Sequence, residues 1–199
     1  SNTCATSSLA TSNQVILTTG AKTNTTSATI CTGQIYTVGT NTYNATGTYS
    51  TTGTSFLGCD SISIVNLTVN PSPTISVNSG SICSGNNFTI TPSGASTYTI
   101  QGGSAVKTPT ANATYTVIGT NTAGCVSSTF ATSTITVNTT PTIAVNSGSI
   151  CAGNNFTISP SGASTYTIQG GSAIKTPTSN TTYTVTGTSS AGCVSSSFA

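Results

Sequence analysis

The chain has 199 residues, and only four of them carry a formal charge: Lys22, Lys107, Lys175 and Asp60. General acid–base catalysis needs titratable side chains with tuned pKa values, and the chain has no His and a single carboxylate, so we expect no enzyme and no cofactor. A net charge of +2 gives no field that would attract nucleic acid, and no apolar run approaches the roughly 20 residues that span a bilayer.

The first segment, residues 1–18, is similar to a stretch that occurs later in the chain. NTCATSSLATS at residues 2–12 corresponds to AGCVSSTFATS at residues 123–133. Cys4 therefore has the position of a cysteine near the end of a module, and Gln14–Thr18 has that of the final strand. We interpret residues 1–18 as the closing strand of a preceding module or as a donor strand.

Residues 19–70 form a shorter module. Cys31 and Cys59 are 28 positions apart, whereas Cys83 and Cys125 are 42 positions apart. The segment keeps a Cys-x-Gly opening, a Gly-Cys element and a closing Leu-Thr-Val stretch. We expect a small β-sandwich that is a relative of the modules after it.

Residues 71–138 and 139–199 are two copies of one module. Residues 71–131 align without gaps on residues 139–199 at an offset of 68, and 49 of the 61 positions are identical. The second copy stops at Ala199, before the equivalent of the last strand of the first copy. Pro71, Pro73 and Pro141 mark short, stiff joints, so we expect a semi-rigid array.

The alternation of apolar and polar residues predicts an all-β fold of tandem immunoglobulin-like sandwiches. Ser and Thr make up about 40% of the chain, and β-branched Thr suits a pleated sheet. Five strands are expected in the second module, at residues 74–77, 87–91, 97–101, 113–118 and 132–137. The expected core consists of Ile75, Val77, Phe88, Ile90, Ile100, Tyr115, Val117, Ile135 and Val137.

The cysteines predict one disulfide in each module, because the repeat selects one pairing among fifteen. These pairs are Cys31–Cys59, Cys83–Cys125 and Cys151–Cys193. Without His or a CxxC motif a zinc site is not expected, so no metal ligands are predicted. Disulfides indicate an oxidising, extracellular location. Cys4 is left unpaired or forms an intermolecular bond.

The incomplete last module allows two interpretations. The sequence is a window of a longer tandem array, or the N-terminal segment of one subunit completes the last sheet of its neighbour. An unpaired sheet edge is a template for such strand addition. Head-to-tail contacts of this kind do not close and so generate filaments.

The motifs resemble immunoglobulin-like and PKD-like repeats of very large surface proteins from Bacteroidota. The resemblance rests on Ser-Ile-Cys-x-Gly, Thr-Tyr-Thr-Val-x-Gly-Thr and Ala-Gly-Cys, and on a second repeat type around Gly58-Cys59-Asp60-Ser61-Ile62. It implies export, often by the type IX route, and a role as an adhesin stalk or surface filament. Ser61 is a candidate O-glycosylation site, because Asp60-Ser61-Ile62 is similar to the signal of that group.

We therefore predict a structural subunit or segment of an extracellular filament or adhesin stalk. Its partners are copies of itself, joined head to tail by strand donation, or further modules of the same chain. The alternative is a module that binds carbohydrate or another surface, with glycans as partners. Stacking faces for sugars are offered by Tyr36, Tyr43, Tyr49, Tyr98 and Tyr166. Lys107 and Lys175 are expected to be solvated residues at sheet edges, and Asp60 to cap a turn.

Overall fold

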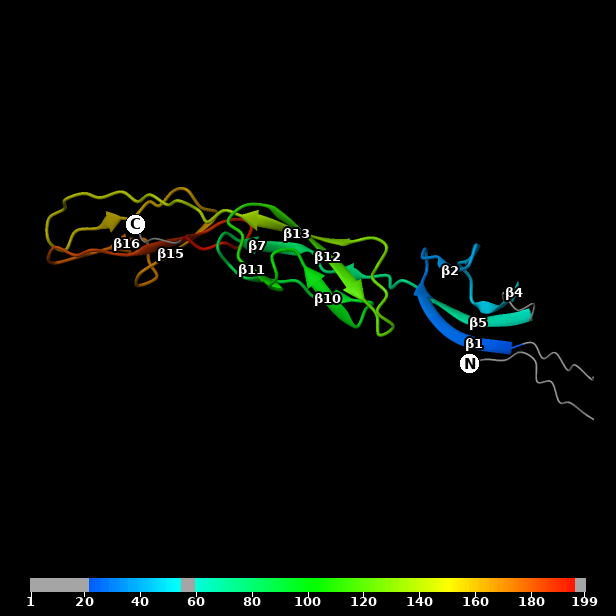
Figure 1. Ribbon diagram of the computed structural model, residues 1–199. Helices are drawn as coiled ribbons and strands as arrows, with labels where there is room; N and C mark the ends of the chain where they lie inside the picture. The colour runs from blue at the N-terminus through cyan, green and yellow to red at the C-terminus, as the bar shows by residue number, and fades with distance from the viewer. Residues whose placement is uncertain (1–21, 55–59, 196–199) are drawn as a thin grey trace, which may run out of the picture. The chain divides into compact units, whose positions relative to one another are not determined.

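The computed structural model describes residues 22–54 and 60–195, and every regular element in them is a β-strand (Figure 1). The predicted all-β fold class is confirmed. These residues include no helix that could cross a membrane. The chain divides into two compact units: the first comprises residues 1–74, 94–97 and 119–129, and the second comprises residues 75–93, 98–118 and 130–199.

The first repeat is built on a three-stranded sheet with the order β1-β5-β4. β1 (Lys22–Cys31) runs parallel to β5 (Asp60–Asn70), and β4 (Gly47–Thr54) runs antiparallel to β5 on its other side. Val65 and Leu67 alternate with exposed residues along β5, so one face of the strand is buried. β2 (Tyr36–Val38) and β3 (Asn41–Tyr43) form a separate hairpin.

The second repeat is built on a four-stranded sheet with the order β10-β12-β13-β7. β13 lies inside this sheet, antiparallel to β12 and parallel to β7. Two pairs of short strands, β6 with β9 and β8 with β11, complete the repeat. The bounds are β6 Ser76–Val77, β7 Gly80–Cys83, β8 Phe88–Thr89, β9 Pro92–Ser93, β10 Thr97–Ile100, β11 Val106–Lys107, β12 Ala113–Thr120 and β13 Ala131–Asn138.

The core of the second repeat lies under β12 and β13. Ile90, Val117 and Ile135 are buried, and the other residues expected in this core are half-buried. All five expected strands are present, with ends shifted by up to two residues. β7 was not expected, because Gly-Ser-Ile-Cys contains residues typical of turns. Its pairing with β13 is nevertheless what fixes the position of Cys83.

The third repeat retains part of the strand pairing of the second. β14 (Phe156–Thr157) pairs with β16 (Ile174–Lys175) as β8 does with β11, and β15 (Thr165–Ile168) pairs with β17 (Val185–Thr188) as β10 does with β12. The counterpart of the β6–β9 pair is a single bridge between Ala144 and Ser161. The buried core of the third repeat consists of Ile143, Ile158 and Val185. Among residues 139–195, no strand occupies the position that β13 occupies in the second repeat.

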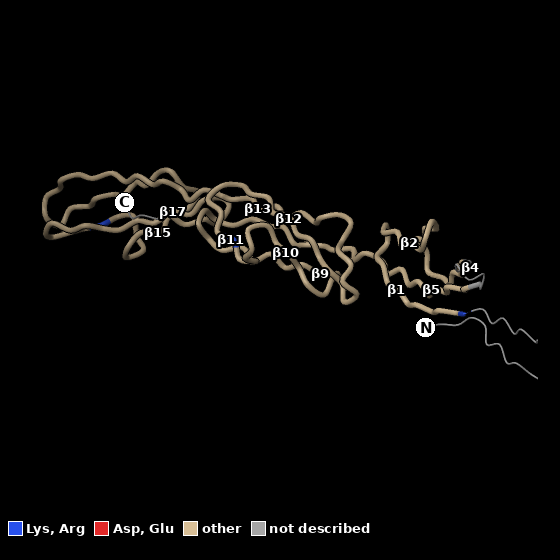
Figure 2. Tube along the Cα trace, viewed as in Figure 1, with Lys and Arg blue, Asp and Glu red and all other residues tan. Residues whose placement is uncertain are grey.

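The three lysines are widely spaced along the described chain (Figure 2), and Asp60 is the single acidic residue of the sequence. Lys107 and Lys175 are only 8% exposed, so their assignment as solvated edge residues was wrong. The Lys107 ammonium donates a hydrogen bond to Gln101 O at 2.6 Å and lies 4.8 Å from the centre of the Tyr115 ring. Lys175 makes the same two contacts with Gln169 and Tyr183. Each lysine thus replaces lost hydration with a carbonyl and a π-face.

Ile135→Ala tests the importance of β13 for the second repeat. Because Ile135 is fully buried, we expect its truncation to lower the free energy of unfolding by about 2–5 kcal/mol. Ile118→Ala is the matched control, since Ile118 belongs to the same sheet and is 40% exposed, and it should change stability by much less. Chemical denaturation followed by circular dichroism measures both. Equal losses for the two variants would contradict the assigned core.

Candidate functional site at the repeat junctions

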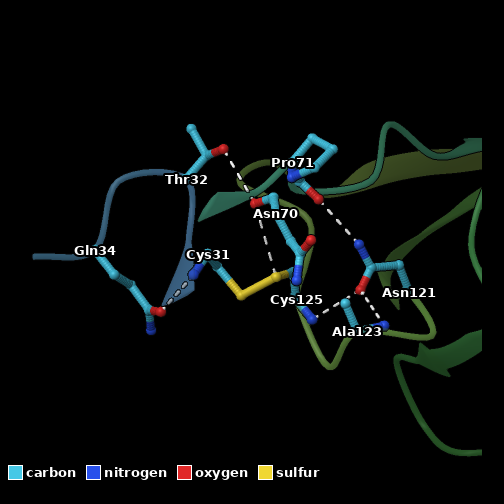
Figure 3. Close-up of a disulfide and its surroundings, with 8 residues drawn as sticks. All are labelled: Cys31, Thr32, Gln34, Asn70, Pro71, Asn121, Ala123 and Cys125. Atoms are coloured by element: carbon cyan, nitrogen blue, oxygen red, sulfur yellow. Dashed lines mark hydrogen bonds between the residues drawn. A yellow bond between two sulfur atoms is a disulfide. The ribbon is translucent and has the colours of Figure 1, made fainter. Parts of the chain in front are cut away.

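The two disulfides among the described residues each join consecutive repeats. Cys31 of the first repeat is bonded to Cys125 of the second (Figure 3), and Cys83 of the second repeat is bonded to Cys193 of the third. The Cα atoms are 5.5 Å and 5.6 Å apart, within the usual range for a disulfide. The predicted pairs Cys31–Cys59, Cys83–Cys125 and Cys151–Cys193 are therefore wrong, as is the expectation of one bridge within each module.

The parallel strand pairing explains this correction. In the first repeat, Cys31 lies beside Asn70, the last residue of β5, while Asp60 at the start of β5 pairs with Thr54. At about 3.3 Å per residue, the two ends of β5 are roughly 33 Å apart. A cysteine next to the end of the closing strand is thus near the start of the next repeat and far from the residues that precede that strand. Cys83 lies beside Asn138 in the same way.

The junction between the first and second repeats is also held by hydrogen bonds (Figure 3). Asn121 donates from Nδ2 to Pro71 O at 2.9 Å, and its Oδ1 accepts from Cys125 N at 2.9 Å. Asn70 O accepts from Thr32 N at 2.9 Å and lies 3.8 Å from Cys125 Sγ. Residues 70 and 71, which link the two repeats, are therefore bonded to the turn after Cys31 and to the loop that carries Cys125.

The second junction repeats this arrangement with a different side chain. Ser189 stands where the second repeat has Asn121, and its Oγ accepts from Cys193 N at 3.1 Å. Asn138 O accepts from Ser84 N at 2.9 Å and lies 3.8 Å from Cys193 Sγ. The disulfide and the bonds to the closing-strand carbonyl and to the cysteine N–H thus recur at both junctions, whereas among the described residues the bond from Asn121 to the Pro71 carbonyl occurs only at the first.

Cys151 is the third cysteine of the opening type. It is a free, exposed thiol, although the turn after it is intact, with Asn154 N donating to Cys151 O at 3.0 Å. Cys4 and Cys59 lie outside the described residues. The prediction that Cys4 is unpaired or forms an intermolecular bond therefore stays a prediction, whereas Cys31, the predicted partner of Cys59, is bonded to Cys125. Of the three cysteines in the Cys-x-Gly motif at the start of a repeat, Cys31 and Cys83 are in disulfides and Cys151 is a free thiol.

A groove of about 540 Å³ runs beside Cys151 in the third repeat. One wall is formed by residues 145–150, the counterpart of β7 and the residues before it, and the opposite wall by residues 177–183. Phe156, Ile158 and Val185 contribute the apolar floor. The full lining is Val145, Asn146, Ser147, Gly148, Ser149, Ile150, Ala152, Phe156, Ile158, Pro177, Thr178, Ser179, Asn180, Thr181, Thr182, Tyr183 and Val185.

Comparison with the second repeat shows what this groove corresponds to. There the counterparts of the two walls, β7 and β12, both pair with β13, which lies between them. Six positions that are half-buried in the second repeat are exposed in the third: Gly80 and Gly148, Ile82 and Ile150, Cys83 and Cys151, Ser84 and Ala152, Ala113 and Thr181, and Thr116 and Thr184. The groove therefore has the position of a β13-like strand.

Polar groups that bind β13 in the second repeat recur along the groove. Asn112 Oδ1 accepts from Val137 N at 2.8 Å, and Ser79 Oγ accepts from Thr134 N at 3.0 Å. Their counterparts, Asn180 and Ser147, make no side-chain hydrogen bond to any described residue. By contrast, Asn146 keeps the two bonds that its counterpart Asn78 makes, so the wall itself is ordered as in the second repeat.

The remaining predicted site residues lie in the first repeat or on strands. Ser61 is exposed near the start of β5, and its Oγ donates to Gly53 O at 3.0 Å. The rings of Tyr43 and Tyr49 stack on each other with centroids 4.0 Å apart, which covers one face of each. Asp60 is the first residue of β5.

Within residues 22–54 and 60–195 no group of acidic, His or Cys side chains could hold a metal ion.

No family model and no curated protein matches the chain. Among solved structures, it is similar to a Ca²⁺-stabilised adhesin with which an Antarctic bacterium binds ice (16% identity, TM-score 0.40, 76% of this chain and 54% of that one). It is also similar to the eight N-terminal Ig domains of the Down syndrome cell adhesion molecule (15% identity, TM-score 0.35, 73% and 30%). The chain thus spans about half, or less, of these structures. Likenesses of this strength carry no argument about function.

Removing the Cys83–Cys193 bridge tests its role in the second unit. Since the bridge closes a loop of 110 residues, we expect the double variant C83S/C193S to lose about 4–5 kcal/mol of stability on the chain-entropy model. Chemical denaturation of the monomeric protein measures this loss. Cys151→Ser is the control, because it removes a thiol and no bridge.

Proposed function

We propose that the chain is a structural subunit or segment of an extracellular filament or adhesin stalk, made of tandem immunoglobulin-like modules that join head to tail by strand donation. The supporting observation is the groove of the third repeat, which has the shape and polar pattern of a site for one β-strand. The occupant we propose is Thr11–Thr18 of a second copy, called the donor segment below.

The two disulfides support an extracellular location, since such bonds persist in oxidising compartments. Their placement also supports a load-bearing role. Each bridge, together with a hydrogen-bonded linker, connects one repeat to the next. Tension along the chain would then act on covalent links at the joints, in addition to the strand pairs within each repeat.

The donor segment matches β13 in its apolar pattern. When Thr18 is placed at the position of Asn138, Val15 and Leu17 come to the positions of Ile135 and Val137. Ile135 is buried and Val137 half-buried, so both apolar side chains would enter the groove. Burying a side chain of this kind contributes about 1.5–3 kcal/mol. Asn13 would stand at the position of Ser133, whose Oγ donates to Asn78 O, and it too has a donor group.

The spacing to the next opening cysteine gives the same register independently. Asn70 precedes Cys83 by 13 positions, Asn138 precedes Cys151 by 13, and Thr18 precedes Cys31 by 13. In this register Leu17 pairs beside Ile150 and Thr18 beside Cys151, as Val137 and Asn138 pair beside Ile82 and Cys83. The apolar pattern and this spacing therefore select the same register, which needs one more residue between Cys4 and the strand than the second repeat has between Cys125 and β13.

The low charge of the chain favours such association. With four charged residues in 199, little electrostatic repulsion opposes the approach of a second copy. Main-chain hydrogen bonds along both walls would supply much of the affinity, and the two apolar side chains would set the register.

Val15→Asp tests strand donation. A carboxylate at the position of the buried Ile135 would lose its hydration without a cationic partner, so we expect assembly to fall at least tenfold. Gln14→Asp is the matched control: it adds the same charge at the position of Thr134, which is exposed. Light scattering and negative-stain microscopy measure filament formation.

Normal filaments from Val15→Asp would overturn strand donation by this segment. A second experiment tests the alternative that the chain is part of a longer tandem array. If cross-linking of native material places a segment that follows residue 199 of the same chain in the groove, the proposed donor is wrong, while the tandem array remains.

A further inference from the structure

We propose that Cys151 forms a disulfide with Cys59 of a second copy, so that every strand-donation junction is also covalently locked. This inference rests on the head-to-tail assembly proposed above. It is carried by two observations: Cys151 is a free, exposed thiol between Ile150 and Ala152, which line the groove, and the equivalent positions in the other repeats, Cys31 and Cys83, are both bonded to a cysteine of the following repeat.

The bridges inside the chain follow one rule. An opening cysteine lies beside the last residue of the closing strand, and it bonds to the closing cysteine that comes 55 positions after that residue: Cys125 after Asn70, and Cys193 after Asn138. The sulfur of that closing cysteine lies 3.8 Å from the carbonyl of the strand's last residue in both cases. The end of the closing strand therefore determines which cysteine is reached.

Applying the rule to the donor segment identifies Cys59. If Thr18 takes the place of Asn138 beside Cys151, the following module is the first repeat of the incoming copy. In both observed bridges the opening cysteine is bonded to the closing cysteine of the following repeat. In the first repeat of the incoming copy, the cysteine of the Gly-Cys element that corresponds to Cys125 and Cys193 is Cys59. Cys4 precedes the donor segment, so the rule does not assign it to Cys151.

The chemistry is a thiol–disulfide exchange that needs a low-molecular-weight disulfide as the oxidant. The Cys151 thiolate attacks that disulfide, which releases one small thiol and leaves a mixed disulfide on Cys151. The Cys59 thiolate of the incoming copy then attacks the Cys151 sulfur, which forms the bridge and releases the second small thiol. Two protein thiols are oxidised and one small disulfide is reduced to two thiols. Strand donation would raise the rate by holding the two cysteines together.

Complementary variants test this pairing. Filaments are assembled with oxidised glutathione, dissolved in detergent without reductant and separated by size. The full chain should give a ladder of covalent multimers, and Cys151→Ser or Cys59→Ser alone should give less than a tenth of it. An equimolar mixture of these two variants should give covalent dimers and no longer species, because each dimer consumes the single competent pair. Cys4→Ser is the control and should keep the ladder.

Peptide mapping of the excised dimer should identify a Cys151–Cys59 peptide. A Cys151–Cys151 or Cys151–Cys4 peptide would overturn the inference. Filaments that form normally but dissolve into monomers with Cys151 still alkylatable would also overturn it, while leaving strand donation intact. Failure of the full chain to form any filament would overturn both proposals.

Discussion

The parallel pairing between the opening and closing strands of a repeat determines most of the structure. It places the opening cysteine beside the last residue of the closing strand, at the point where the chain leaves for the next repeat. Antiparallel pairing would have put that cysteine at the other end of the strand. The choice of strand direction thus decides that the disulfides connect repeats instead of closing them internally.

The same pairing accounts for the difference between the second and third repeats. The two are nearly identical in sequence, the β8–β11 pair recurs as β14–β16, and the two hydrogen bonds of Asn78 recur at Asn146. What differs is the presence of a strand between the two walls. Because β13 contributes the buried Ile135 and satisfies groups on both sides, its position in the third repeat is an apolar slot bordered by unused hydrogen-bond acceptors.

A chain with so few charges has to hold itself together by other means. The described residues show three: alternating aliphatic side chains under each sheet, side-chain amides and hydroxyls that bind the backbone, and disulfides at the joints. Even the two buried lysines are bound by carbonyls and aromatic rings, and no described side chain is an acidic partner to them. None of these interactions depends on the protonation of a carboxylate.

The sequence by itself determined the fold class, the repeat and most strands, because these follow from local alternation and from the near identity of two segments. It also marked Ile135, Val117 and Ile90 as core residues, since alternation decides which face each side chain takes. It did not determine the cysteine pairing or the burial of Lys107 and Lys175. Those depend on which strands are neighbours and in which direction they run, and β7, with its Gly and Ser residues, gives no local signal of its parallel partner. Only the tertiary structure brings Cys31 to Cys125 and Cys83 to Cys193, across 94 and 110 residues of chain.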